Sequence, residues 1–345
     1  MRIALDATYS LGDNLSGVGV YCREMLAGLA RAHPETTFEF WYRPHRWVRS
    51  LGARLPANCR RRLLHEPLAP RAAALFHGLN QRLPTVRLRH RVTTFHDLFV
   101  LTGDYSTAEF RRRFQLQARD AAARSELIVT VSEFTARQLE ECLGVERARL
   151  RVIHHGVRLP PEAEAGGREN IVLHVGAVQR RKNLARLIEA FQRLGPGWRL
   201  LLAGSLGFGG AEILAGLQQT PVRDRIQWLG YVRAEELSRL YRRARIFAFP
   251  SLDEGFGMPV LEAMAWGVPV VASNCSALPE VAGDAALLVD PLDTEAIAAA
   301  LTALATQESL REDLMARGRR RAAAFTWEAA VTKTWSVYQE LLAGV

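Results

Sequence analysis

Short apolar stretches alternate with amphipathic helical stretches along almost all of the 345 residues, and this pattern constrains the fold more than any other feature. Such alternation is typical of parallel sheets whose faces are covered by helices. In the first half we predict strands at residues 2–7, 38–42, 91–95, 127–131 and 150–154, and helices at 20–32, 108–124 and 134–142. The sequence therefore predicts an α/β protein.

The alternation stops once, at residues 160–168, which are rich in Pro, Glu, Ala and Gly and are interpreted as a linker. It then restarts, with strands predicted at residues 171–175, 199–203, 226–228, 246–249, 268–272 and 286–289. We predict two Rossmann-like, doubly wound domains at 1–160 and 169–326. A ligand is expected at the carboxyl ends of their strands, in a central cleft that the domains face.

Two carboxylates stand eight positions apart in the run P-S-L-D-E-G-F-G-M-P-V-L-E, which begins at Pro250. Glu254 follows a predicted strand, and Glu262 falls about one turn into the helix that Pro259 is expected to open. The glycines between them, Gly255 and Gly257, leave backbone N–H groups open to a nearby ligand. The run predicts a site for a polyhydroxylated, phosphorylated small molecule.

A second predicted site is the loop at residues 176–183, which joins a strand to the next helix. Helix N-termini attract anions, and Arg181 and Lys182 add positive charge there. Lys182 and Lys333 are the only lysines in a chain that otherwise uses arginine. This scarcity indicates that residue 182 requires a compact ammonium group and not a guanidinium.

Six segments in order resemble one family, the family 4 glycosyltransferases, which have the GT-B fold and a glutamate-x7-glutamate motif. The likeness spans nearly the whole chain and is greatest to bacterial surface-polysaccharide mannosyltransferases. The segments are Ser16-Gly17-Val18-Gly19-Val20-Tyr21, Thr94-Phe95-His96-Asp97-Leu98, Val131-Ser132-Glu133-Phe134-Thr135, Ile153-His154-His155-Gly156-Val157, the loop from Val175 to Leu184, and the run from Pro250.

The resemblance implies a retaining glycosyltransferase that moves a hexose from a nucleotide diphosphate sugar to a hydroxyl group. Glu262 resembles the glutamate that accepts hydrogen bonds from the donor's ribose, and Glu254 the one beside the transferred sugar. Arg181 and Lys182 would stabilise the leaving phosphate. Some members of the family have an arginine where Ala177 stands here, so whether Arg180 or Arg181 contacts phosphate stays open.

The resemblance also implies roles for residues other than the charged side chains of these two loops. His96 would line the sugar pocket, either donating a hydrogen bond to a sugar hydroxyl or helping to carry charge. Backbone groups of Gly255, Phe256, Gly257, Met258 and Gly176 would contact sugar or phosphate, and Gly17 and Gly19 would form a flexible loop near the donor phosphates or the acceptor. The helix at residues 327–345 would cross back onto the first domain.

GDP-mannose is the favoured donor, with UDP-glucose, UDP-N-acetylglucosamine and a deoxyhexose donor left open, and the acceptor is predicted to be a glycan or lipid-linked. Two alternatives are kept: a GT-B nucleotide-sugar epimerase or phosphorylase, and a catalytically silent partner protein that binds nucleotide sugar. No Asp-x-Asp occurs, so no metal site is predicted, and no cofactor is expected.

The net charge of +9 belongs to the first half. Residues 1–160 hold 25 arginines against 15 acidic residues, whereas the remainder holds 20 basic and 21 acidic residues. This charge is compatible with an anionic membrane surface, with a diphosphate-linked acceptor or simply with solvated arginines on helices, and nucleic acid is the weakest option because no recognised motif accompanies it. We expect reversible contact with an anionic membrane surface, because many acceptors of such enzymes are lipid-linked. Four scattered cysteines and no predicted leader or spanning segment favour the cytoplasm, with a peripheral position on the inner face of the plasma membrane.

Overall fold

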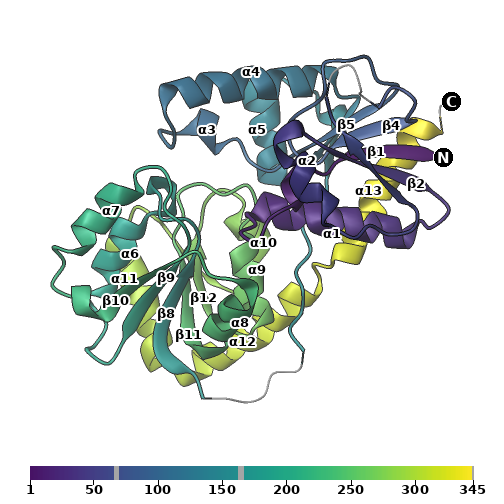
Figure 1. The fold of residues 1–345 in the computed structure, drawn as a ribbon. Coiled ribbons are helices and arrows are strands. Elements are labelled where there is room, and N and C mark those ends of the chain that lie inside the picture. The colour runs from purple at the N-terminus through teal and green to yellow at the C-terminus, as the bar shows by residue number, and fades with distance from the viewer. Residues whose placement is uncertain (66–69, 162–166, 344–345) are drawn as a thin grey trace. The chain divides into compact units, whose positions relative to one another are not determined.

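The computed structural model describes residues 1–65, 70–161 and 167–343. The chain forms two compact units (Figure 1). The first contains Met1–Thr102, Thr107–Gly156 and Thr326–Val345, and the second contains Gly103–Ser106 and Val157–Phe325. Each unit is an α/β body built on its own parallel sheet, as the alternation in the sequence predicts.

The sheet of the first unit has seven parallel strands in the order β3-β2-β1-β4-β5-β6-β7. The strands are β1 (Arg2–Asp6), β2 (Thr37–Tyr42), β3 (Cys59–Leu63), β4 (Leu75–Gly78), β5 (Arg91–Phe95), β6 (Leu127–Thr130) and β7 (Leu150–Val152). Strands β2 and β3 are added on one side of β1, and β4 to β7 are added on the other side, so the switch point lies between β1 and β4. Ligands of open α/β sheets bind outside such a switch point, at the carboxyl ends of the strands.

Helices cover both faces of this sheet. Figure 1 shows α4 on one side and α1 and α13 on the other. The helices are α1 (Gly17–Ala32), α2 (Pro44–Leu51), α3 (Phe99–Thr102), α4 (Ala108–Arg124), α5 (Glu133–Leu143) and α13 (Trp327–Leu342). A Cβ on Gly28 of α1 would lie 2.4 Å from Val331 of α13, so glycine permits the close packing of these two helices.

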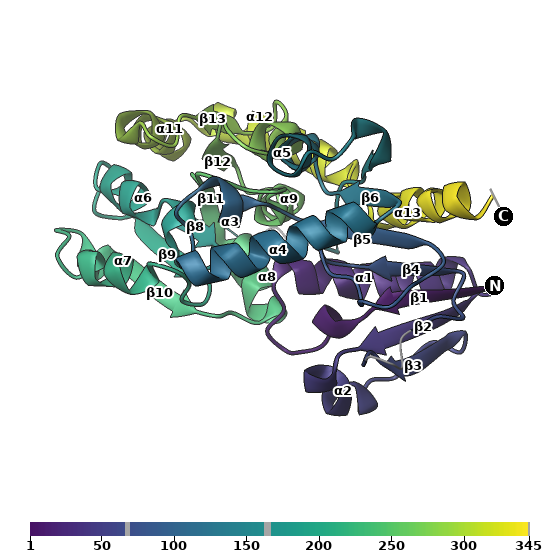
Figure 2. The same ribbon diagram turned by 90° about the horizontal axis from the view of Figure 1, so that it is seen from above.

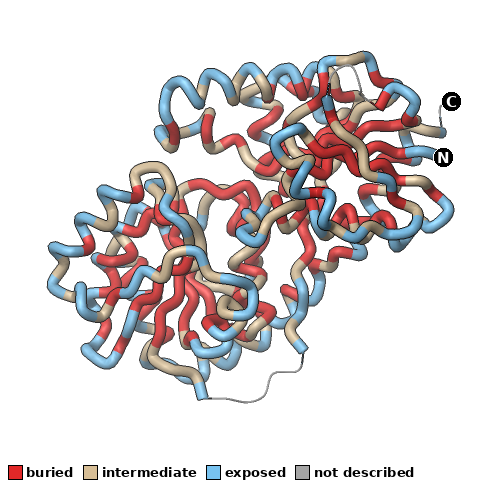
Figure 3. Tube along the Cα trace, viewed as in Figure 1, coloured by how far each residue is buried: buried red, intermediate tan, exposed pale blue. Residues whose placement is uncertain are grey.

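The sheet of the second unit has six parallel strands in the Rossmann order, β10-β9-β8-β11-β12-β13. The strands are β8 (Glu169–Val175), β9 (Arg199–Ala203), β10 (Ile226–Gly230), β11 (Ala244–Phe249), β12 (Val270–Ser273) and β13 (Leu287–Val289). β8 and β11 are neighbours at the centre and flank the switch point. Their residues Val172 and Ile246 are fully buried, and Figure 3 shows the central strands as the most buried part of the unit.

Helices also cover both faces of the second sheet. One core cluster joins residues of α6, α7 and α11 to the strands. Outside this cluster, α8 packs against β8, α9 packs against β11 and β12, and α12 packs on α9 (Figure 2). The helices are α6 (Leu184–Phe191), α7 (Gly210–Leu217), α8 (Ala234–Arg243), α9 (Met258–Ala265), α10 (Leu278–Ala282), α11 (Thr294–Thr306) and α12 (Glu308–Ala323).

All predicted strands are present within one or two residues of their expected ends, but β3 and β4 were not predicted. β3 contains Arg60, Arg61 and Arg62, which the sequence offered only as a cluster of positive charge. It is an edge strand, where one row of neighbours is missing and charged residues are tolerated. β4 is a four-residue strand that lies in the interior of the sheet.

Several arginines stabilise helix ends instead of forming a charged surface. Arg168 is the clearest case, because its guanidinium donates to five backbone carbonyls. Nη1 bonds to Tyr241, Arg242 and Ala244 at the end of α8, and Nη2 bonds to Trp266 and Gly267 just after α9. The last carbonyls of a helix lack intrahelical partners and carry partial negative charge, so a cation there is favourable.

Replacing Arg168 with alanine should lower the free energy of unfolding of the second unit by about 2–4 kcal/mol, since several carbonyls at helix ends, most of them partly buried, lose their donor. Urea denaturation followed by circular dichroism measures the change. Arg223→Ala is the matched control, because that exposed arginine pairs with the adjacent, exposed Asp224 and its loss should cost about 0.5 kcal/mol or less. Equal losses in the two variants would contradict the capping role.

Candidate active site

The two predicted site loops follow the two strands that flank the switch point of the second unit. The first loop begins at Gly176, directly after β8, and the second begins at Pro250, directly after β11. They are joined by backbone hydrogen bonding, since Leu252 N donates to Arg181 O at 2.7 Å. Strand order therefore brings together two segments that are more than seventy residues apart in the chain.

Glu254 lies between two cations of the first loop. Its Oε1 accepts a hydrogen bond from Nζ of Lys182, and its Oε2 lies 2.9 Å from Nη1 of Arg181. All three side chains are at least 88% buried, so little water screens the charges. Nζ of Lys182 also lies 4.5 Å from the centre of the Phe249 ring, over its face. With all three groups charged, the cluster carries a net charge of +1.

The ionisation of Glu254 is set by these two cations. Burial alone would raise its pKa, but Arg181 and Lys182 outweigh burial and lower the pKa to about 2. The carboxylate is therefore charged throughout the neutral range. A group of such low basicity is a poor general base, which operates best with a pKa near the working pH. Glu254 is suited to orienting hydroxyl groups and balancing charge.

The position of the two cations depends on an unusual backbone. Asn183 adopts the left-handed conformation, with a φ of 58°, and its Nδ2 donates to Pro250 O at 3.0 Å and Pro291 O at 2.6 Å. Asparagine tolerates this conformation better than most residues. Gly176 has a φ of 155°, and a Cβ there would lie 3.1 Å from Cε of Lys182. Both residues thus keep Lys182 in place.

Arg180 points away from this cluster. Its Nη2 lies 2.8 Å from Oε2 of Glu212 and its guanidinium lies over the ring of Phe208. The sequence left open whether Arg180 or Arg181 serves as the phosphate ligand. Arg181, unlike Arg180, shares Glu254 with Lys182.

Glu262 lies in α9, as predicted, with its carboxylate held by Tyr241 of α8. The phenol hydroxyl donates to Oε2 at 2.8 Å. Burial raises the pKa of Glu262, although the hydrogen bond from Tyr241 acts in the opposite direction. Glu254 and Glu262 are thus opposite cases: the first is kept acidic by cations, and the second is made less acidic by desolvation.

The turn between the glutamates leads into α9. Gly257 has a φ of 97° and precedes the helix, and Met258 is its first residue. Pro259 lies in the first turn, as the sequence predicted. Phe256 is 4% exposed and its ring packs 6.0 Å from that of Phe325, so its side chain belongs to the core. Only the backbone of this residue is suited to a ligand contact.

His96, Gly17 and Gly19 lie in the first unit. His96 follows β5, and its Nε2 bonds to the carbonyl of Leu79 at 3.0 Å. Because a carbonyl only accepts, Nε2 must carry the proton. Burial lowers the pKa of His96 to about 4, so the ring is neutral at neutral pH and Nδ1 is a hydrogen-bond acceptor. In this arrangement a sugar hydroxyl would donate to Nδ1, and the low pKa disfavours a charged His96 at neutral pH.

Gly17 and Gly19 were predicted to lie in a loop, and this is wrong. Both belong to the first turn of α1, which is capped by Ser16, whose Oγ accepts from Gly19 N at 3.4 Å. A Cβ on Gly19 would lie 3.0 Å from the carbonyl of Tyr9 and 2.9 Å from Leu15. Gly19 is thus required by close packing at the helix start.

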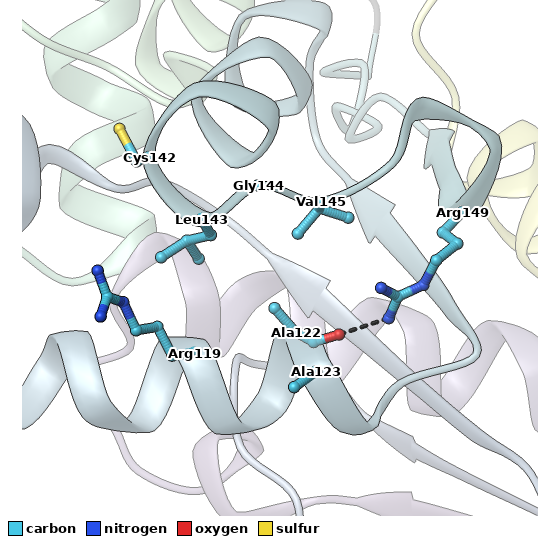
Figure 4. Close-up of a pocket in the computed structure, with 8 residues that line it drawn as sticks. All are labelled: Arg119, Ala122, Ala123, Cys142, Leu143, Gly144, Val145 and Arg149. Atoms are coloured by element: carbon cyan, nitrogen blue, oxygen red, sulfur yellow. Dashed lines mark hydrogen bonds between the residues drawn. The ribbon is translucent and has the colours of Figure 1, made fainter.

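One pocket of the first unit, of about 370 Å³, lies between α4 and the end of α5 (Figure 4). Its lining includes Arg119, Cys142, Leu143 and Arg149. Nη2 of Arg149 donates to the carbonyls of Ala122 and Ser125, so this guanidinium caps α4. The pocket contains none of the predicted site residues.

Comparison with known proteins identifies the family. Residues 15–159 match the model for "Glycosyltransferase Family 4", and residues 159–321 match that for "Glycosyl transferases group 1". The O-antigen chain mannosyltransferase B of Escherichia coli is 35% identical over 285 residues, which cover 77% of this chain and 74% of the relative. The chain belongs to glycosyltransferase family 4. The enzyme is thus a glycosyltransferase.

Two further relatives are more distant. The O-antigen chain mannosyltransferase RfbU of Salmonella typhimurium is 28% identical over 60% of this chain and 58% of its own length. The MMP alpha-(1->4)-mannosyltransferase of Mycolicibacterium hassiacum is 31% identical over 75% of this chain and 65% of its own. The matches thus span between 58% and 74% of the lengths of these three relatives.

Solved structures confirm that the glycosyltransferase has the GT-B fold. Sucrose-phosphate synthase from Thermosynechococcus elongatus has a TM-score of 0.81 at 24% identity, with both chains fully covered. Anabaena HepE, solved with UDP and glucose, has a TM-score of 0.76 at 16% identity over 99% of this chain and 100% of its own. WaaG, which is involved in lipopolysaccharide biosynthesis, has a TM-score of 0.70 at 15% identity, covering 98% and 99%.

Sequence reasoning missed Tyr241 and the anchoring role of Asn183. Tyr241 lies on an ordinary amphipathic helix, and nothing in its neighbourhood indicates a contact with a residue 21 positions later. Asn183 was included in the predicted loop at residues 176–183, but only as the last residue before the helix. Its preference for left-handed backbone was the available signal.

Replacing Glu254 with glutamine in this glycosyltransferase should lower the free energy of unfolding by about 3–5 kcal/mol, because Arg181 and Lys182 lose their buried counter-charge. The loss should be full above pH ~4.5, the ordinary value for glutamate, and shrink as the pH falls toward 2, where the native Glu254 is itself protonated. Chemical denaturation at several pH values measures it.

Glu212→Gln is the control for that measurement, since it removes an exposed carboxylate from Arg180. It should cost about 1 kcal/mol or less. A Glu254→Gln loss no larger than that of Glu212→Gln, or one that is independent of pH down to 2, would contradict the ion cluster as described.

Proposed function

We propose that this glycosyltransferase moves mannose from GDP-mannose to a hydroxyl group of a glycan or lipid-linked acceptor, with retention of configuration and with no cofactor beyond the donor. The observation that carries the proposal is the cluster of Arg181, Lys182 and Glu254 at the switch point. Glu262 lies on the following helix, about one turn after its start. Likeness to O-antigen chain mannosyltransferase B, at 35% identity, favours mannose as the sugar.

Each group of the cluster has a role in this proposal. Arg181 and Lys182 bind the diphosphate and stabilise the negative charge that grows on it as the glycosidic bond breaks. Glu262 accepts hydrogen bonds from the ribose hydroxyls, and charge-assisted bonds of this kind are strong. Glu254 orients the sugar. Since Glu254 and neutral His96 are poor bases, the departing phosphate itself takes the proton of the acceptor hydroxyl.

Binding of the phosphates requires the two cations to be shared. In the structure both are engaged by Glu254, and a diphosphate offers several oxygens to the same donors. Lys182 has three N–H donors and Arg181 has five, so each can keep a bond to Glu254 and still bind phosphate. The cluster is therefore preorganised, and little rearrangement is needed when the donor arrives.

GDP should raise the melting temperature of this protein more than UDP, ADP or dTDP, because a ligand that binds only the folded state stabilises it. The gain is about 2.7 kcal/mol at a hundred times the dissociation constant. Differential scanning fluorimetry with and without magnesium measures the shift, which should not require the metal and should fall in Glu262→Ala.

Glu212→Ala is the matched control and should keep the shift. A larger shift with another nucleotide would overturn GDP-mannose as donor, and no shift with any would overturn nucleotide-sugar binding. Incubation with GDP-mannose alone tests the alternatives: conversion to another GDP-hexose would indicate an epimerase, and release of mannose 1-phosphate that requires inorganic phosphate would indicate a phosphorylase. Binding with no transfer in any acceptor screen would indicate a silent protein.

Reversible contact with an anionic membrane through α4 is a further part of the proposal. The outward face of this helix exposes Arg112, Arg113 and Arg119, and between them Leu116 is 66% exposed. Arg113 lies over the ring of Phe110, which is 44% exposed. Such a combination fits a surface of anionic head groups. No helix of the described residues is long and apolar enough to cross a bilayer.

Co-sedimentation with vesicles tests this surface. The protein should bind vesicles that contain anionic phospholipid and bind neutral ones weakly, and the triple variant Arg112→Gln, Arg113→Gln, Leu116→Gln should lose most binding. The control is Arg233→Gln, Arg239→Gln, Leu292→Gln, which changes exposed residues of the same kinds in the second unit. Equal binding to both vesicle types, or equal loss in both variants, would contradict the proposal.

A further inference from the structure

Tyr241 is a buried residue whose hydroxyl group reaches the predicted ribose site. It lies on α8 and is 2% exposed, with its ring 5.9 Å from that of Phe247. The hydroxyl oxygen lies 2.8 Å from Oε2 of Glu262 and 3.5 Å from the carbonyl of Pro259. Packing fixes the ring and with it the hydroxyl oxygen, and the nearer acceptor of the hydroxyl proton is the carboxylate.

This contact leaves one side of the carboxylate for a ligand. Burial and the charge of Glu262 raise the pKa of the Tyr241 phenol far above 10, so the hydroxyl is a permanent donor. Its bond goes to Oε2, and the structure records no hydrogen bond to Oε1 from the parts of the chain that it describes. A glutamate has three rotatable bonds, and ordering them costs free energy. Because Tyr241 already holds the Glu262 carboxylate, this side chain is ordered before any ligand binds.

We propose that Tyr241 is a positioning residue, which fixes the carboxylate of Glu262 in the orientation that accepts the vicinal hydroxyls of the donor's ribose. This inference rests on the proposed ribose contact of Glu262. Tyr241 itself touches no substrate in this account. Its effect passes through Glu262. The quantity that should change is therefore the preference of the protein for a nucleotide with a ribose 2′-hydroxyl over one without it.

The same contact favours the ionised form of Glu262. Burial raises the pKa of Glu262 and the Tyr241 hydrogen bond lowers it, and Tyr241 is the titratable group recorded against this carboxylate. Removing the hydroxyl leaves the burial unopposed, so the pKa rises further. Since a protonated carboxyl accepts ribose hydroxyls less well, the pH below which binding weakens should move upward.

The experiment compares Tyr241→Phe with the wild type in binding GDP and 2′-deoxy-GDP, by calorimetric titration from pH 5 to 9. The wild type should prefer GDP by about tenfold or more, as expected for a hydrogen bond to a charged group. In Tyr241→Phe this preference should fall several-fold, and the acidic limb of GDP binding should shift to higher pH. An unchanged preference with an unchanged limb would overturn the inference.

Three controls separate positioning from stability and from the proposed function. Phe247→Leu loosens the packing of the same ring but keeps the hydroxyl, and Tyr338→Phe removes a buried hydroxyl from the first unit, where it bonds to His77. Both should keep the preference for GDP. Glu262→Gln should lose it. If Glu262→Gln keeps the preference, the ribose contact itself fails. If Glu262→Gln loses the preference but Tyr241→Phe keeps it, only the positioning role fails.

Discussion

The candidate site depends on one buried carboxylate placed between two cations. Glu254 alone would be costly to bury as an anion, and Arg181 and Lys182 would repel each other without it. Together they form a rigid group of net charge +1 at the carboxyl ends of β8 and β11. The positive φ of Asn183 and the missing Cβ of Gly176 make room for this arrangement, and the Rossmann strand order brings its two loops side by side.

The arginine excess of the first half has two physical explanations, which the structure separates residue by residue. Arg149 donates to carbonyls at the end of α4, and Arg61 donates to the carbonyl of Ala53 just after α2. These guanidiniums stabilise helix ends. Arg112 and Arg113 instead stand on the exposed face of α4. Net charge therefore overstates how much positive surface is available to a partner.

Local sequence predicted much of this architecture, because strand and helix periodicity and the Pro259 helix start are local signals. Both loops were expected at the carboxyl ends of strands, but the direct pairing of Glu254 with Arg181 and Lys182 was not predicted. The edge strand β3 was missed because its charges mask its pattern. Tyr241 was missed because a contact between two helices depends on how they pack, and no local pattern records it.

The measurement that tests the central claim most directly is a crystal structure of the protein with GDP-mannose. The account predicts diphosphate oxygens within hydrogen-bond distance of Arg181 and Lys182, and both ribose hydroxyls on the carboxylate of Glu262. Phosphates bound at Arg180, or a nucleotide bound away from the carboxyl ends of β8 and β11, would contradict it.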